Sequence, residues 1–142
     1  MAKEEEQKNK IVQVTGKRKT AVARDRVKPG LGLVTINDVP LDLWQPEYSR
    51  IKIREALLLA DELSQKVDIK VIVKSGGVSS QTDAIQQAIA KGMVEFFNDE
   101  KLKKIYLDYD RNLLVYDPRR TEPHKPSRSR KGCRRHKQRS KR

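Results

Sequence analysis

The composition of the chain changes abruptly after Asp117, and this change divides it into two parts that cannot fold in the same way. Residues 118–142 hold 12 of the 32 Lys and Arg residues but one of the 19 acidic residues, so they carry +11 of the net charge of +13. Pro118, Pro123 and Pro126 exclude a regular helix there, and the segment offers no apolar core. We therefore expect an extended basic tail that orders only on a partner, because burial cannot offset its ordering entropy.

The residues before the tail are enough for one small domain. Residues 1–10 are polar and rich in glutamate, which predicts a disordered leader, and residues 11–117 are expected to form a single globular domain with a modest core. No stretch approaches the ~20 apolar residues of a membrane helix, and the leader has no hydrophobic signal region. These features predict a cytoplasmic protein that does not bind membranes.

Alternating apolar residues predict several short strands. Residues 11–15 alternate weakly before Gly16, which predicts a bend or bulge at that glycine. Residues 20–27 and 33–36 are also β-compatible and lie on either side of a Lys-Pro-Gly turn, a spacing that favours an antiparallel meander. A clearer strand covers residues 67–73, where every second residue is apolar.

Three helices are predicted from helical spacing of apolar residues. The first lies within residues 47–63, the second begins near Ser79 or Ser80, and the third covers residues 99–107. Ser80 and Asp83 fit a capping box at the start of the second helix. Residues 113–115 form a last short apolar run, either a strand or a packed extended segment. The predicted fold class is α+β, a small sheet with helices on one face.

The first candidate site is the basic run Gly16-Lys17-Arg18-Lys19-Thr20, which Arg24 and Arg26 follow. Three adjacent cations cannot all face a core. Arg18 is suited to fork bidentately onto a phosphate, whereas Lys17 and Lys19 act as point charges. The alternative is a solvated hairpin surface, but the large positive charge of the chain favours phosphate contact.

The second candidate site is the segment from Ser75 to Gln81, between a predicted strand and a predicted helix. Gly76 and Gly77 allow backbone amides to approach a ligand closely, and a helix N-terminus favours an anion. The anion is either a nucleotide phosphate in an enzyme or an RNA phosphate in a binding protein. A plain strand-to-helix connection is an equally good interpretation of this weak motif alone.

The third candidate site is the tail, whose 25 residues reach roughly 80 Å at ~3.3 Å per residue. Its binding to RNA is expected to weaken steeply with salt, because each neutralised phosphate releases counterions. Both histidines of the chain, His124 and His136, lie in the tail, where nothing fixes a catalytic geometry. Cys133 lacks the partners of a four-ligand zinc site, so we expect neither a catalytic site, a metal, a cofactor nor a small-molecule substrate.

Three ordered motifs resemble the universal family of the ninth protein of the ribosomal small subunit. The Glu47-Tyr48 region and residues 117–123 resemble its archaeal and eukaryotic members more than its bacterial ones. Residues 16–24 are similar to the first signature of the family, residues 75–92 to the second, and residues 117–123 to a third conserved stretch. The closing Ser140-Lys141-Arg142 matches the terminus of the family. Ser75 departs from the pattern, because the family usually has a further glycine there.

The resemblance implies a structural, non-enzymatic protein of the small subunit, with a fold like the second domain of ribosomal protein five and its left-handed β-α-β crossover. It also implies a body in the head of the subunit, beside neighbouring ribosomal proteins, and a tail end that contacts transfer RNA in the peptidyl site. The residues expected to contact transfer RNA are Ser140, Lys141 and Arg142. Those expected to bind ribosomal RNA are Lys17, Arg18, Lys19, Thr20, Arg24, Gly76, Gly77, Ser79, Ser80, Gln81, Arg119, Arg120, Lys125, Arg128, Arg130, Lys131, Arg134 and Arg135.

Two other functions remain as alternatives. Small-molecule kinases of the galactokinase-mevalonate type resemble the same fold and use a glycine-rich loop before a helix, but they need a second lobe for which this chain has no room. A DNA-compacting protein is the other alternative, and the acidic residues spread through the body count against it. Equal affinity for duplex DNA and structured ribosomal RNA at matched salt would favour DNA compaction.

Overall fold

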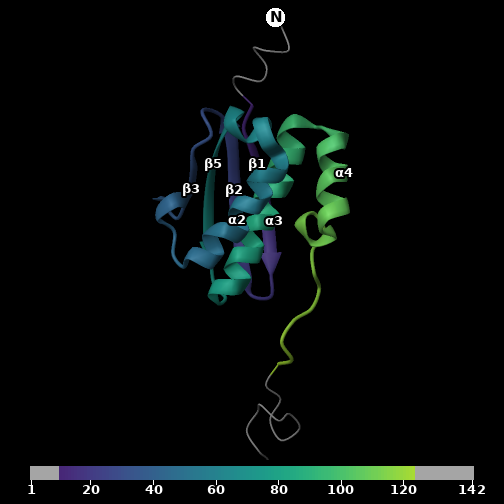
Figure 1. The fold of residues 1–142 in the computed structure, drawn as a ribbon. Helices are drawn as coiled ribbons and strands as arrows, with labels where there is room; N and C mark the ends of the chain where they lie inside the picture. Colours follow the sequence, from purple (N-terminus) through teal and green to yellow (C-terminus); the bar gives the residue numbers. More distant parts are fainter. Residues whose placement is uncertain (1–9, 124–142) are drawn as a thin grey trace, which may run out of the picture.

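The computed structural model describes residues 10–123, which form one sheet covered on one face by helices (Figure 1). The strands are β1 (Val12–Arg18), β2 (Ala21–Pro29), β3 (Val34–Ile36), β4 (Val39–Pro40) and β5 (Val67–Lys74). The α-helices are α2 (Glu47–Ala60), α3 (Val78–Phe97) and α4 (Glu100–Tyr109), and the 3-10 turns are η1 (Leu41–Leu43), η2 (Asp61–Lys66) and η3 (Arg111–Leu113). None of the helices in this part of the chain is long and apolar enough to cross a membrane. The predicted α+β class, with helices on one face, is confirmed.

The order of the strands corrects the predicted meander. The sheet runs β1-β2-β5-β3-β4, so β5 lies between β2 and β3. β2 pairs antiparallel with β1 and β5, whereas β3 pairs parallel with β5. The central place suits β5 because all four of its helix-facing residues are buried, namely Val67, Ile69, Val71 and Val73. Short connections between neighbouring segments suggested the meander, but burial of the most regular apolar strand decides the order.

The connection from β3 through α2 to β5 has the left-handed form that the family resemblance implied. In Figure 1, β3 and β5 both run downward, α2 lies in front of the sheet, and β5 lies to the right of β3. This is the rare hand for a crossover between parallel strands. Sequence periodicity carries no information about it.

Helix α3 forms the centre of the core and packs against β1, β2, β5 and the other two α-helices. Its residues from Ala84 to Ala90 are all buried, including the polar Gln86 and Gln87. Gly16 lets β1 approach this helix closely, since a Cβ atom there would lie 2.1 Å from the Ala84 carbonyl oxygen. Strand β1 runs straight through Gly16 to Arg18, so the bend or bulge predicted at Gly16 is wrong, and the glycine serves close packing instead.

The ends of the helices differ from the predictions in two places. Helix α3 begins at Val78 after Gly77 and has no side-chain cap, so the predicted capping box of Ser80 and Asp83 is wrong. Asp83 instead pairs with cations of neighbouring elements. The left-handed backbone of Asn98 ends α3, and the Asp99 side chain accepts a hydrogen bond from the Lys101 amide to start α4. The apolar run at 113–115 is a turn, since Leu113 ends η3 and the Val115 amide donates to the Arg111 carbonyl at 2.9 Å, so the predicted strand or extended segment is wrong.

Candidate nucleic-acid interface

The structure brings the three sequence motifs together at one end of the body, which we call the hairpin end: residues 16–21, 75–81 and 115–120. Gly76 packs against the hairpin, because a Cβ atom there would lie 2.8 Å from the Ala21 Cβ. Arg18 joins the hairpin to the C-terminal segment through an ion pair of 2.6 Å with Asp117. In Figure 1 the last described residues leave the body at this same end. Segments about 100 residues apart in the sequence therefore form one surface.

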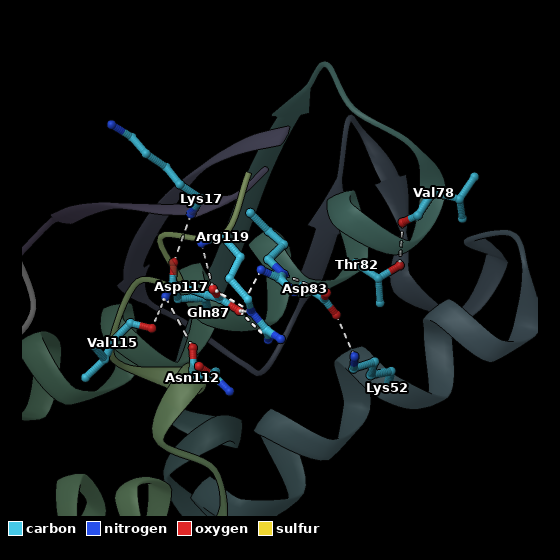
Figure 2. Close-up of polar contacts among 11 residues, drawn as sticks. Lys17, Lys52, Val78, Thr82, Asp83, Gln87, Asn112, Val115, Asp117 and Arg119 are labelled. Carbon is cyan, nitrogen blue, oxygen red and sulfur yellow. Dashed lines mark hydrogen bonds and ion pairs between the residues drawn. The ribbon is translucent and has the colours of Figure 1, made fainter. Parts of the chain in front are cut away.

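The hairpin presents two exposed lysines. Lys17 and Lys19 flank Arg18 and are exposed, as is Thr20. Lys19 has a positive φ of 52°, which turns the chain tightly between β1 and β2. The Lys17 amide donates a hydrogen bond of 2.9 Å to Gln87 Oε1, while the Lys17 side chain points away from the body (Figure 2). The two ammonium groups are thus available to an anion, and the backbone beneath them is fixed.

Arg18 differs from its neighbours, because it is held inside the molecule. Its side chain is 20% exposed and pairs with Asp117 at 2.6 Å and with Asp83 at 3.5 Å. Asp117 also accepts hydrogen bonds from the backbone and the guanidinium of Arg119. The bonds from Arg119, with the charge of Arg18, lower the pKa of Asp117 to about 2. Asp117 therefore stays ionised at neutral pH and bridges two arginines that the sequence marked as RNA contacts.

Lys52 of α2 extends this network to a third element. Its ammonium lies 2.5 Å from Asp83 Oδ1 (Figure 2). Burial alone would lower the pKa of Lys52, but the hydrogen bond and charge of Asp83 raise it above its ordinary value. Because Asp83 is shared by Lys52 and Arg18, the network ties α2, α3 and β1 together behind the exposed lysines.

Gln87 of α3 is the residue that sequence reasoning missed. Its carbonyl oxygen accepts from the Lys17 amide, and its Nε2 donates to the carbonyl oxygens of Asn112 at 3.2 Å and Val115 at 2.9 Å (Figure 2). One buried amide thus fixes both the hairpin and the segment that leads to the tail. The sequence did contain a signal: two adjacent glutamines, Gln86 and Gln87, lie within the apolar stripe of this helix. Because buried polar side chains need hydrogen-bond partners, such a pair indicates a bonded amide in the core.

The Ser75–Gly77 loop delivers the N-terminus of α3 to the same end. Ser75 and Gly76 have φ values of 65° and 76°, and the Gln81 side chain donates to the Ser75 carbonyl at 3.1 Å. The positive φ of Ser75 explains why a glycine suits this position in the family, because Cβ disfavours it. Helix α3 has no side-chain cap and no acidic residue in its first turn. Its first backbone amides therefore keep their capacity to bind an anion.

The other predicted RNA-binding residues lie elsewhere or outside the described residues. Arg24 is exposed on the opposite face of the sheet from Arg18, so it does not join the hairpin end. Arg119 and Arg120 lie at the exit of the chain, where Arg120 Nε donates to the Tyr116 hydroxyl at 3.1 Å. The remaining predicted positions lie beyond residue 123, outside the part described: Lys125, Arg128, Arg130, Lys131, Arg134, Arg135, Ser140, Lys141 and Arg142.

Comparison with known proteins agrees with the motifs. The family model described as ribosomal protein S9/S16 matches residues 16–142. The small ribosomal subunit protein uS9 of Methanococcus maripaludis is 48% identical over 131 residues, which cover 92% of this chain and 98% of the relative. Its counterpart in Methanococcus vannielii is 47% identical over the same length. That of Desulfurococcus amylolyticus is 51% identical over 118 residues, covering 83% of this chain and 84% of the relative.

The three relatives are archaeal, in agreement with the archaeal and eukaryotic resemblance of the Glu47-Tyr48 region and residues 117–123. The identity extends over more than four fifths of each chain, so the likeness is not confined to one motif. The chain belongs to the family of ribosomal protein S9/S16 of the small subunit.

Proposed function

We propose that the chain binds ribosomal RNA in the head of the small subunit through its hairpin end, and contacts peptidyl-site transfer RNA through the end of its tail. As a member of its family it is a structural constituent of the small ribosomal subunit in the cytoplasm, and not an enzyme. The observation that carries the proposal is the meeting of three basic or amide-rich motifs at the end of the body from which the chain leaves.

The residues of the hairpin end have different roles, some contacting RNA and others holding the contact residues in place. Lys17 and Lys19 face solvent and contact RNA phosphates directly, and the first amides of α3, around Ser79 and Ser80, hold a further phosphate. Arg18 and Asp117 keep these groups and the segment at 115–120 in a fixed relation, which lowers the entropy lost when RNA binds. The tail supplies most of the positive charge, and hence most of the salt dependence.

The contribution of the hairpin is tested with Lys17→Gln and Lys19→Gln together in the full chain. The probe is an archaeal small-subunit ribosomal RNA transcript, and affinity is measured across a salt series. Loss of two phosphate contacts should lower the slope of log affinity against log salt by about 1.5. The matched control changes Lys101 and Lys104, two exposed lysines of α4. Equal affinities and slopes for the two variants would contradict direct contact by the hairpin.

The contribution of the tail end is tested by deleting residues 140–142 and reconstituting small subunits. We expect weaker binding of transfer RNA in the peptidyl site, with assembly of the subunits largely intact. The Lys101→Gln/Lys104→Gln variant again removes the same charge from another surface. Unchanged peptidyl-site affinity in the truncated subunits would refute the terminal contact.

A further inference from the structure

The face of the sheet opposite the helices is basic, and no other element of residues 10–123 covers it. Helices α2, α3 and α4 all lie on the other face (Figure 1). Along β2, the exposed Arg24, Arg26 and Lys28 alternate with buried residues, and along β5 the exposed Lys70, Ile72 and Lys74 do the same. The outward positions of both central strands are therefore mostly cationic. We call this surface the open sheet face.

The strand register places these cations side by side. Arg26 lies opposite Lys70 of β5 and Gln13 of β1, and Arg24 lies opposite Ile72 and Thr15. Neighbouring strands are about 4.8 Å apart, and successive outward residues of one strand about 6.8 Å apart. These residues line a hollow on the face together with Val14 and Asp25; the full lining is Gln13, Val14, Thr15, Arg24, Asp25, Arg26, Lys70 and Ile72.

In the described part of the chain, two of the five cations on this face are paired with carboxylates, and three are not. Lys28 pairs with Asp68 at 3.5 Å, and Lys70 pairs with Asp38 at 2.5 Å. Within residues 10–123, no carboxylate lies close enough to Arg24, Arg26 or Lys74 to form an ion pair. Placing like charges on adjacent strands is unfavourable unless an external anion screens them. The face thus carries a lasting excess of positive charge.

We propose that the open sheet face binds the phosphate backbone of RNA, as a second contact surface that adjoins the hairpin end. This inference rests on the proposed function and adds Arg26, Lys70 and Lys74 to the RNA-binding residues. The described part of the face has no aromatic side chain on which bases can stack, so it contacts phosphates and sugars without reading sequence. Arg24 and Arg26 fork onto phosphate oxygens, and Gln13 and Thr15 add hydrogen bonds.

A protein partner suits this face less well. The core of a protein interface is depleted of charged residues and rich in aromatic ones. At the centre of the face the exposed hydrophobic side chain is that of Ile72, which is 45% exposed. Its nearest outward neighbours along β5 are Lys70 and Lys74, and Arg24 lies opposite it on β2. Desolvating these cations against an apolar surface is costly, whereas an RNA backbone neutralises them.

The proposal is tested by changing Arg24, Arg26 and Lys74 to glutamine together in the full chain. The control variant changes Lys101, Lys103 and Lys104 of α4 to glutamine, which removes the same charge from exposed positions on the helix side. With the ribosomal RNA transcript, we expect the sheet variant to bind at least tenfold more weakly than the control. Its salt slope should fall by about 2 to 3, as for three lost phosphate contacts. Equal binding by the two variants would overturn the proposal.

Photo-crosslinking in assembled subunits gives a second test that does not depend on lowering the charge. A photoreactive phenylalanine replaces Ile72, which is 45% exposed on the face, or Ile105, which is 46% exposed on α4. Crosslinks from position 72 to RNA support the proposal, and crosslinks from there to another protein overturn it. If the unchanged chain bound the RNA without salt dependence, the proposed function itself would fail. If the unchanged chain bound the RNA with the expected salt dependence but the sheet variant bound as tightly as its control, this inference alone would fail.

Discussion

Asp25 of β2 is expected to make the body less stable as the pH rises towards neutrality. Its side chain faces α3 and is 2% exposed. A Cβ atom at Gly92 would lie 2.5 Å from its Oδ2, so the missing side chain of that glycine makes room for the carboxylate. Within residues 10–123 neither carboxylate oxygen has a hydrogen-bond partner. Burial raises the pKa of Asp25 from 3.8 to about 8, and the nearby Arg26 amide opposes this rise only in part.

The sign and size of the effect follow from the two pKa values. The folded state binds the proton more tightly than the unfolded state, so the free energy of unfolding is unaffected by Asp25 below pH 3.8. It then decreases by about 1.4 kcal/mol per pH unit until the folded-state pKa near 8. At pH 7 the accumulated cost is about 4 kcal/mol. This is a large part of the 5–15 kcal/mol typical of small domains.

The test compares the unchanged chain with Asp25→Asn by urea unfolding from pH 4 to pH 8. Asparagine reproduces the shape of the protonated acid, so we expect the two chains to be equally stable near pH 4. Near pH 7 the variant should be more stable by about 4 kcal/mol. The two chains share every other titratable group, so effects of those groups cancel in the difference. Parallel pH profiles for the two chains would refute the reasoning.

Asp68 serves as a control, because its pKa is shifted in the opposite direction from that of Asp25. It accepts hydrogen bonds from the amides of Leu31 at 2.9 Å and Leu33 at 3.1 Å and pairs with Lys28. Burial would raise its pKa, but these bonds and the charge of Lys28 lower it below its ordinary value. Asp68→Asn should therefore reduce stability at neutral pH, and by less as the pH falls through the lowered pKa of Asp68.

Two further predictions concern the packing around α3. Gly16→Ala should lower the free energy of unfolding by about 3 kcal/mol, because its Cβ would meet the backbone at Ala84 and Ala88. Gly77 has open space around it and an ordinary φ of −86°, so Gly77→Ala should unfold within about 0.5 kcal/mol of the unchanged chain in the same urea titration. Equal losses of stability in the two variants would contradict the packing argument. Gln87→Ala should cost about 2–3 kcal/mol and speed hydrogen exchange at the Lys17 amide, because three backbone groups lose their partner. The control is Gln81→Ala, which removes one exposed hydrogen bond to Ser75 and should cost less than about 1 kcal/mol. If the Lys17 amide kept its protection from hydrogen exchange in Gln87→Ala, the role of Gln87 would be refuted.

Local patterns predicted the elements well, because periodicity and turn residues act over a few positions. The strand at 67–73 appears as β5, and the stripe containing Ile85, Ala88 and Ile89 is buried in α3. Patterns were less reliable where a residue had two possible uses. Gly16 signalled a bend but allows β1 to approach α3, and Ser80 with Asp83 signalled a capping box but Asp83 holds two cations.

The candidate site was predicted in its parts and not in its arrangement. Three motifs were marked in the sequence, yet nothing in their spacing indicated that Arg18 pairs with Asp117 and is therefore mostly enclosed. Gln87 was missed because a glutamine in an apolar stripe has no motif, and its partners lie 25 to 70 residues away along the chain. Arg24 shares a motif with Arg18 but faces the other side of the sheet.

The sequence by itself determined the nearly neutral body, the basic segment after Asp117, the α+β class and the family, because these depend on composition, local period and ordered motifs. Tertiary structure decided that β5 lies between β2 and β3, and that the crossover is left-handed. It also decided that Asp25 is buried while Arg24 and Arg26 are exposed on the open sheet face. The physical reason is that strand order and facing depend on which distant surfaces exclude water together, and no local pattern records that choice.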